Sequence, residues 1–304
     1  MKPPSGPEIL ATAVVPWNEQ LEFEAERFRR QIHVLARDLT RHLYIFGTAG
    51  EGYAVTEAQF DQICRTFWES SREAGANPMV GLISLSLPTI IARIERARAM
   101  GFRLFQLSLP SWGPLNDREI DRFFRETCGR FRDCEFHHYN LLRTKRLLTS
   151  TEYRRLAAEH PNFIAVKQST ADAAVLADLM TVTPRLRFYL TEFGYAVARR
   201  THDVGLLISL ATVNPERAKG FVAGTDAQRA TELEELRQMV AGLKSPDDRY
   251  QIDGAFDKML YRVTDPDFPL RLLPPYESAT EEDFARFLAT IPPGWRRAQP
   301  ALKR

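Results

Sequence analysis

Short runs of apolar and β-branched residues recur along the first two thirds of this 304-residue chain, and polar segments separate them. Such runs, bounded by glycine, proline or polar residues, are typical of buried strands. The pattern predicts eight strands, at 8–15, 42–46, 78–83, 103–109, 135–139, 163–167, 186–190 and 205–210.

The segments between these runs have helical character. Phe23, Phe28 and Ile32 recur among charged residues at close to helical spacing within 22–39. Thr56, with Gln59 three residues later, forms a capping-box pattern that begins a helix reaching about residue 74. Further helices are predicted at 88–100, 116–130, 150–159, 172–181 and, briefly, after the seventh strand.

Strict alternation of strand and helix, at this length and strand count, predicts the fold class. We expect an α/β protein, a (β/α)8 TIM barrel of parallel strands occupying residues 1–226. Strand patterns stop at Ala227, and helical patterns follow at 228–243, 254–263 and 280–291. Residues 227–304 are therefore predicted to form a C-terminal helical appendage on the barrel.

Composition narrows the function classes. The formal net charge is +2, from 41 basic and 39 acidic residues, so charge gives no case for nucleic acid or membrane partners. No run approaches the roughly 18 apolar residues of a membrane span. The three cysteines, Cys64, Cys128 and Cys134, show neither CxxC nor zinc-like spacing. We expect a cytoplasmic protein whose partner is a small molecule.

One lysine stands at the end of an apolar strand. The sixth run, Phe163 to Val166, leads directly into Lys167, whereas the other six lysines lie among polar or charged neighbours. Burial disfavours an ammonium group and leaves a free amine that can attack a carbonyl, so Lys167 is a candidate Schiff-base residue. The alternative is a lysine that reaches solvent or pairs with a carboxylate.

Active sites of parallel barrels lie at the carboxyl ends of the strands, which selects a few further candidates. The turn from Gly47 to Glu51 offers backbone amides and the Thr48 hydroxyl to a small anion, although it is also an ordinary connection. Tyr139 ends the fifth strand and could carry protons, or simply pack. His137 and His138 face opposite sides of that strand, so structural roles are expected and no metal site is predicted.

Three motifs carry a family resemblance. The segments Gly47-Thr48-Ala49-Gly50-Glu51, Tyr139-Asn140 and 164–170 (IAVKQST) resemble, in this order, the dihydrodipicolinate synthase / N-acetylneuraminate lyase superfamily. That resemblance implies a (β/α)8 barrel with a C-terminal helical extension, and a Schiff base between Lys167 and a 2-oxo acid such as pyruvate. It further implies that Tyr139 relays protons, that Thr48, Ala49 and Gly50 hold the substrate carboxylate, and that the Ile208 backbone lines the pocket.

The sequence also departs from the family pattern around the second substrate. Ala49 replaces a hydroxyl residue, and Trp112 stands where dihydrodipicolinate synthases have a relay tyrosine. Arg143 lies in a loop one residue shorter than the one whose arginine holds the distal carboxylate. Trp112 and Arg143 remain candidate substrate-binding residues, but a true dihydrodipicolinate synthase is not expected.

The leading hypothesis is a class I aldolase or lyase that acts on a 2-oxo acid, with a sugar-acid-derived substrate. Two alternatives stay open: a dehydratase or deaminase that uses the same imine, and a catalytically degenerate homologue that only binds a 2-oxo acid. The proposed chemistry requires no cofactor and no metal. The resemblance implies a homo-oligomer, either a tetramer or a dimer.

Overall fold

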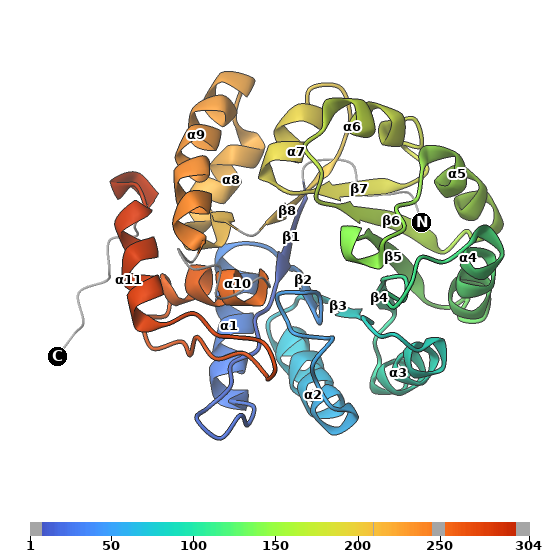
Figure 1. Ribbon diagram of the computed structural model, residues 1–304, viewed down its shortest axis with the longest axis horizontal. Coiled ribbons are helices and arrows are strands. Elements are labelled where there is room, and N and C mark those ends of the chain that lie inside the picture. Colours follow the sequence, from blue (N-terminus) through green and yellow to red (C-terminus); the bar gives the residue numbers. More distant parts are fainter. Residues whose placement is uncertain (1–7, 209, 245–252, 296–304) are drawn as a thin grey trace.

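The computed structural model describes residues 8–208, 210–244 and 253–295. Eight parallel strands form a closed barrel in the order β1 to β8, with β8 pairing to β1 (Figure 1). The strands are β1 (Ile9–Thr12), β2 (His42–Ile45), β3 (Asn77–Gly81), β4 (Leu104–Leu107), β5 (Glu135–Asn140), β6 (Phe163–Gln168), β7 (Arg187–Leu190) and β8 (Gly205–Ile208). The predicted (β/α)8 barrel is confirmed.

Helices surround the barrel and continue beyond it. Those of the barrel are α1 (Ala25–Asp38), α2 (Glu57–Glu73), α3 (Leu87–Met100), α4 (Asp117–Phe124), α5 (Ser150–Glu159), α6 (Ala173–Met180), α7 (Glu192–Ala198) and α8 (Pro215–Ala223). The C-terminal extension consists of α9 (Asp226–Leu243), α10 (Asp253–Arg262) and α11 (Glu281–Thr290). The extension lies beside α7, α8 and the start of the barrel (Figure 1).

Two apolar layers explain why these strands read as continuous hydrophobic runs. Side chains on the outer face of the barrel, such as Leu43, Val166 and Phe188, join the large core beneath the helices. Side chains on the inner face form a separate layer across the barrel interior, made of Leu10, Tyr44, Met79, Ala165, Tyr189 and Leu207. We call this set the interior layer. Strands of a parallel barrel are buried on both faces, and their sequence lacks a simple polar alternation for that reason.

Helix boundaries follow local capping chemistry. The predicted capping box at Thr56 is present, with Gln59 as its partner, and Asn116 begins α4 in the same way. The predicted helix at 116–130 is regular only to Phe124, and its last turn, Arg125–Gly129, is a π-helix. Helix α8, which the periodicity did not single out, begins at Asn214 and Pro215, a cap followed by a proline in the first turn.

The extension shares the large core with the barrel. Leu236 and Met239 of α9, Met259 of α10 and Phe287 of α11 are buried in that core, and α9 packs against both α7 and α11. The boundary at residues 226 and 227 stays a prediction. Among the residues that the structure describes, no helix is long and apolar enough to cross a membrane.

Candidate active site

Lys167 lies inside the barrel near the carboxyl end of β6. Its side chain is buried, with 5% of the residue exposed, and its Nζ donates a hydrogen bond of 2.9 Å to the Tyr44 hydroxyl. The ammonium nitrogen also lies 3.9 Å from the centre of the Tyr139 ring and 4.9 Å from that of Tyr44. The amine therefore sits between two phenols inside the barrel. It does not project outward between the helices.

Tyr44 is the neighbour that the sequence analysis missed. It belongs to β2, which faces β6 across the barrel, and it is only 3% exposed. Side chains alternate along β2, so Leu43 and Ile45 enter the outer core while Tyr44 points inward. That alternation was available in the sequence, but it did not reveal that the hydroxyl would reach across the barrel to Lys167.

The glycine turn directly follows Tyr44 on β2. Phe46 and Glu51 adopt left-handed backbone conformations, with φ of 58° and 53°, which non-glycine residues rarely do. A Cβ placed on Gly47 would come within 2.7 Å of the Tyr44 ring, so the turn packs directly on that ring. Strained backbone of this kind persists only where surrounding structure holds it, and it is common at functional sites.

Polar groups of this turn are left without partners. Thr48 is 5% exposed, and its Oγ1 has no hydrogen-bond partner among the described residues. The backbone amides of Ala49 and Gly50 donate to none of the described backbone carbonyls. A buried polar atom without a partner is costly, so the turn is poised to receive a hydrogen-bonding ligand.

A buried ion pair anchors the turn to the C-terminal extension. Glu51 and Lys258 are both fully buried, and their charged groups lie 2.7 Å apart. The Glu51 carboxylate also accepts hydrogen bonds from the Trp17 indole, at 2.8 Å, and from the Leu273 amide, at 2.7 Å. Burial lowers the pKa of Lys258, while the Glu51 charge opposes that shift.

Lys258 corrects one expectation. The sequence analysis singled out Lys167 alone among the lysines, yet α10 also carries Lys258 into the core, where it pairs with Glu51 of the glycine turn. The described part of the chain thus contains two buried lysines. Lys258 is held by a carboxylate, whereas Lys167 faces phenols.

Tyr139 and Asn140, the last two residues of β5, point in different directions and make different contacts. The Tyr139 ring lies against the Lys167 amine, and its hydroxyl is 3.5 Å from the Ser169 hydroxyl. The Asn140 side chain points away and exchanges two hydrogen bonds with the backbone of Leu148, at 3.1 and 2.9 Å. Asn140 therefore fixes the loop that follows β5.

The remaining predicted site residues differ in their exposure to solvent. Ile208 ends β8 and is buried, with its side chain in the outer core, so only its backbone can face the interior. Arg143 is exposed in a short 3-10 helix, Leu142–Thr144. Trp112, after β4, is 86% exposed. Trp112 therefore lies at the surface, whereas Lys167 is buried. The substrate-binding roles of Ile208, Arg143 and Trp112 stay predictions.

The two adjacent histidines face opposite sides, as expected. His138 points to the helix layer, where its Nδ1 lies 2.9 Å from the Tyr153 hydroxyl. His137 points inward and stacks on Tyr189, with ring centres 5.4 Å apart. Burial lowers the pKa of each to about 3. Among the described residues, no cluster of three or more histidine, cysteine or acidic side chains is placed to hold a metal.

Known proteins with this architecture were then compared with the chain. A sequence profile of the Dihydrodipicolinate synthetase family matches residues 6–245. No curated protein sequence matches the chain significantly. Among solved structures, the Escherichia coli K12 prophage protein YagE, described as a dihydrodipicolinic acid synthase family member in complex with pyruvate, superposes with a TM-score of 0.81 at 16% identity, covering 94% of this chain and 97% of its own.

Two further structures are similarly close in fold. Dihydrodipicolinate synthase from Thermotoga maritima has a TM-score of 0.79 at 15% identity, covering 94% of this chain and 97% of its own. PhdJ, described as bound to a substrate intermediate, has a TM-score of 0.79 at 18% identity, covering 93% and 94%. At these identities the likeness establishes the fold, while the profile covers most of the chain. The chain is therefore a member of the dihydrodipicolinate synthetase family.

Proposed function

We propose that this protein is a Schiff-base-forming lyase or aldolase that acts on a 2-oxo acid through Lys167. The observation that carries the proposal is the position of the Lys167 amine, buried inside the barrel and hydrogen-bonded to the Tyr44 phenol at 2.9 Å. A lysine needs desolvation and proton-accepting neighbours to act as a nucleophile, and this environment supplies both. The pyruvate complex described for YagE agrees with such a substrate.

The glycine turn is the proposed carboxylate site. The unpartnered Thr48 hydroxyl and the amides of Ala49 and Gly50 are donors, and a 2-oxo acid carboxylate is an acceptor of matching size. The turn packs on Tyr44, whose hydroxyl contacts Lys167, so a carboxylate held there would place its neighbouring carbonyl near the amine. Positioning of this kind lowers the entropy cost of the attack.

The covalent steps conserve atoms and charge. The Lys167 amine attacks C2 of the 2-oxo acid, and the carbinolamine loses water to give an iminium ion. In cleavage, the C3–C4 bond breaks, its electron pair moves into the iminium to form an enamine, and the C4 hydroxyl proton leaves, so that an aldehyde departs. Protonation of C3 and hydrolysis of the imine then release the shorter 2-oxo acid and restore the amine.

Two phenols can move the protons of this sequence. The Tyr139 ring lies against the amine, and its hydroxyl is close to that of Ser169, the residue that follows β6. Tyr44 is hydrogen-bonded to the amine itself and is the candidate to accept or return its proton during carbinolamine formation. Trp112 stands at the position of the family's relay tyrosine and has no phenol. In our proposal Tyr44 supplies that second phenol.

The identity of the second product distinguishes the remaining functions. We favour a sugar-acid-derived substrate, because the departures from the family pattern lie at Ala49, Trp112 and Arg143, away from the imine chemistry. A dehydratase or deaminase would use the same imine but would lose a C3 proton, which gives an enamine of the intact substrate. That enamine would then expel the C4 substituent as water or ammonia. A degenerate homologue would bind the 2-oxo acid without turnover.

Exposed apolar side chains at the barrel mouth support a homo-oligomer, a dimer or a tetramer. Leu85, Trp112 and Leu142 follow the neighbouring strands β3, β4 and β5, and each is more than half exposed. Apolar groups gathered in this way mark interaction surfaces. Light scattering should give a mass above that of one chain, and Trp112→Glu should lower it. A monomeric mass for the unaltered protein would contradict this part of the proposal.

Borohydride trapping followed by product analysis tests the function. Reduction in the presence of pyruvate should link pyruvate covalently to the protein. With 2-oxo sugar acids, release of pyruvate plus an aldehyde would establish cleavage, whereas loss of water or ammonia would establish the alternatives. An adduct without any turnover would indicate the degenerate homologue, and no adduct with any 2-oxo acid would overturn the proposal.

A further inference from the structure

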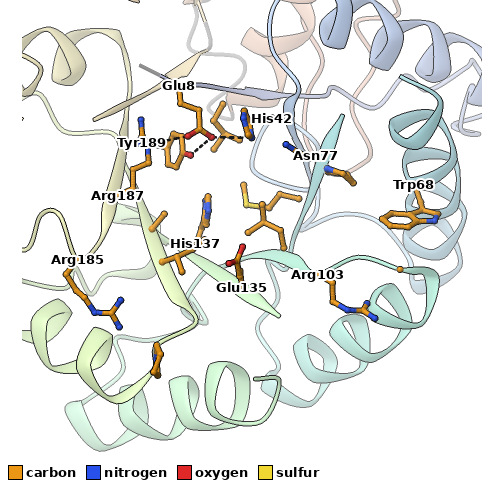
Figure 2. Close-up of a pocket in the computed structure, with 18 residues that line it drawn as sticks. Glu8, His42, Trp68, Asn77, Arg103, Glu135, His137, Arg185, Arg187 and Tyr189 are labelled. Carbon is orange, nitrogen blue, oxygen red and sulfur yellow. Dashed lines mark hydrogen bonds and ion pairs between the residues drawn. The ribbon is translucent and has the colours of Figure 1, made fainter. Parts of the chain in front are cut away.

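A cavity lies at the opposite end of the barrel from the glycine turn. Its volume is about 490 Å³. Most of its lining residues lie on the strands, near their amino ends, or just before them, and Trp68 of α2 lies at one edge (Figure 2). They include Glu8, His42, Arg103, His137, Arg187 and Tyr189. Lys167, Tyr139 and Thr48 are not among them, so this cavity is separate from the candidate active site.

The interior layer divides the two sites. Leu10, Met79, Ala165 and Tyr189 line the cavity and belong to the same layer as Tyr44. Along β6, Ala165 faces the cavity and Lys167, two residues later, lies in the candidate active site. A ligand in the cavity would therefore rest against the side of the layer that faces away from the amine.

Glu8 is the centre of one polar network inside the cavity. The Glu8 carboxylate accepts a hydrogen bond of 2.7 Å from the Tyr189 hydroxyl and lies 3.2 Å from the His42 Nδ1. It also lies 3.4 Å from the Arg187 Nε. Figure 2 shows Glu8, His42 and Tyr189 joined in this way at one side of the cavity. These contacts join the residue that precedes β1 to β2 and β7 at the amino end of the barrel.

His137 is not accounted for by that network. Its ring projects among the labelled side chains and stacks on Tyr189, with an interplanar angle of 20° (Figure 2). The residue is 4% exposed, and its Nδ1 has no hydrogen-bond partner among the described residues. The neighbouring His138 contacts Tyr153 through its Nδ1. Its Nε2 also lacks a partner among the described residues, but His138 does not line the cavity. A buried imidazole nitrogen without a partner is costly, so a ligand in the cavity that hydrogen-bonds to it would be stabilised there.

The other walls define the chemistry of that ligand. Apolar side chains from four strands, Leu10, Met79, Leu104 and Ile164, supply a surface for a flat apolar body. Arg103 and Arg185 stand toward the outer edges of the cavity, on either side of His137 (Figure 2). The lining holds three guanidinium groups against the two carboxylates of Glu8 and Glu135. Glu8 is paired with Arg187. Arg103 also lies 3.6 Å from Asp133, outside the lining, and Arg185 donates to the Ala157 carbonyl. The balance favours an anion.

We propose that this cavity binds a small aromatic carboxylate at the amino end of the barrel. Its ring contacts the apolar walls, its polar substituent bonds to the Nδ1 of His137, and its carboxylate pairs with Arg103 or Arg185. The site does not depend on Schiff-base chemistry at Lys167.

Calorimetric titration with 4-hydroxybenzoate tests the site, because this probe carries the ring, a hydroxyl and a carboxylate. The wild-type protein should bind it. Phenol, which lacks the carboxylate, and acetate, which lacks the ring and the hydroxyl, should both bind more weakly. His137→Phe keeps the stacked ring but removes Nδ1, and should weaken binding by about 5–10-fold. His138→Phe, the matched control on the outer face of the same strand, should leave the affinity unchanged.

Substitution of two surface arginines gives a second test of the site, and these changes do not alter the core. Arg103 and Arg98 both pair with Asp133, at 3.6 and 2.8 Å, but only Arg103 lines the cavity. Arg103→Ala should therefore weaken binding several-fold, and Arg98→Ala should not. Lys167→Met should still bind the probe.

Three results would overturn the proposal: no heat of binding at millimolar probe, equal affinities of the His137 and His138 variants, or loss of binding in Lys167→Met. The last would place the probe at the carboxyl end of the barrel. Failure of the Schiff-base proposal would give a different result. No borohydride adduct would form with a 2-oxo acid, while 4-hydroxybenzoate would still bind.

Discussion

Acid should destabilise this protein through the two adjacent histidines of β5. Burial lowers the pKa of His137, with smaller contributions from His42 and Arg187, and burial alone lowers that of His138. In each case the pKa falls from 6.5 to about 3. Because the folded pKa is depressed, both rings stay neutral in the folded protein and become charged on unfolding once the pH is below about 6.5.

The magnitude follows from the size of the shift. The stabilising contribution is fully present above pH 6.5 and is lost progressively as the pH falls toward 3. Lowering the pH from 7 to 5 costs each histidine about 2 kcal/mol, since about 1.5 pKa units at 1.4 kcal/mol per unit lie in that interval. The pair should therefore lose about 4 kcal/mol of unfolding free energy between these two pH values.

Urea unfolding at pH 7 and pH 5 measures this loss. The His137→Phe/His138→Phe double variant keeps two buried rings but cannot be protonated, so its stability should fall by about 4 kcal/mol less than that of the wild type. For each single variant, the loss of stability between pH 7 and pH 5 should be about 2 kcal/mol smaller than that of the wild type. An equal pH dependence of wild type and double variant would refute the reasoning, as would an NMR titration in which either folded imidazole protonates near pH 6.

Three further changes probe the candidate site. Tyr44→Phe keeps the ring but removes the hydrogen bond to Lys167, and should slow turnover by about 100-fold with the fold unchanged by circular dichroism. Thr48→Val should raise the Kd for pyruvate by about 10-fold, measured by the concentration dependence of borohydride trapping, because a donor to the carboxylate is lost. Lys258→Met leaves the Glu51 carboxylate buried without its cation and should cost about 3–5 kcal/mol in urea unfolding. A rate, affinity or stability equal to that of the wild type would contradict the corresponding role.

The barrel itself could be predicted from the chain because its signals are local. Each strand is a short apolar run, and caps such as Thr56 and Asn116 begin the helices that follow. Such signals need no knowledge of distant residues. They also place Lys167 at the carboxyl end of its strand, where a parallel barrel collects its functional groups.

What the chain could not reveal depends on contacts between distant segments. Lys258 ends no apolar strand run, yet α10 buries it against Glu51, 207 positions earlier in the sequence. The contact between Tyr44 and Lys167 spans 123 positions and two opposite strands. The exposure of Trp112 likewise depends on the path of its loop. These features follow from tertiary packing, which the pattern of apolar and polar residues along the sequence does not reveal.

Locating the borohydride adduct on the chain tests the central claim most directly. The protein is incubated with pyruvate, reduced and digested, and the peptides holding Lys167 and Lys258, the two lysines buried in the described structure, are compared by mass spectrometry. We predict that pyruvate is attached at Lys167 alone and that Lys167→Met yields no adduct. An adduct at Lys258, or none at Lys167 with pyruvate and longer 2-oxo acids, would contradict the account.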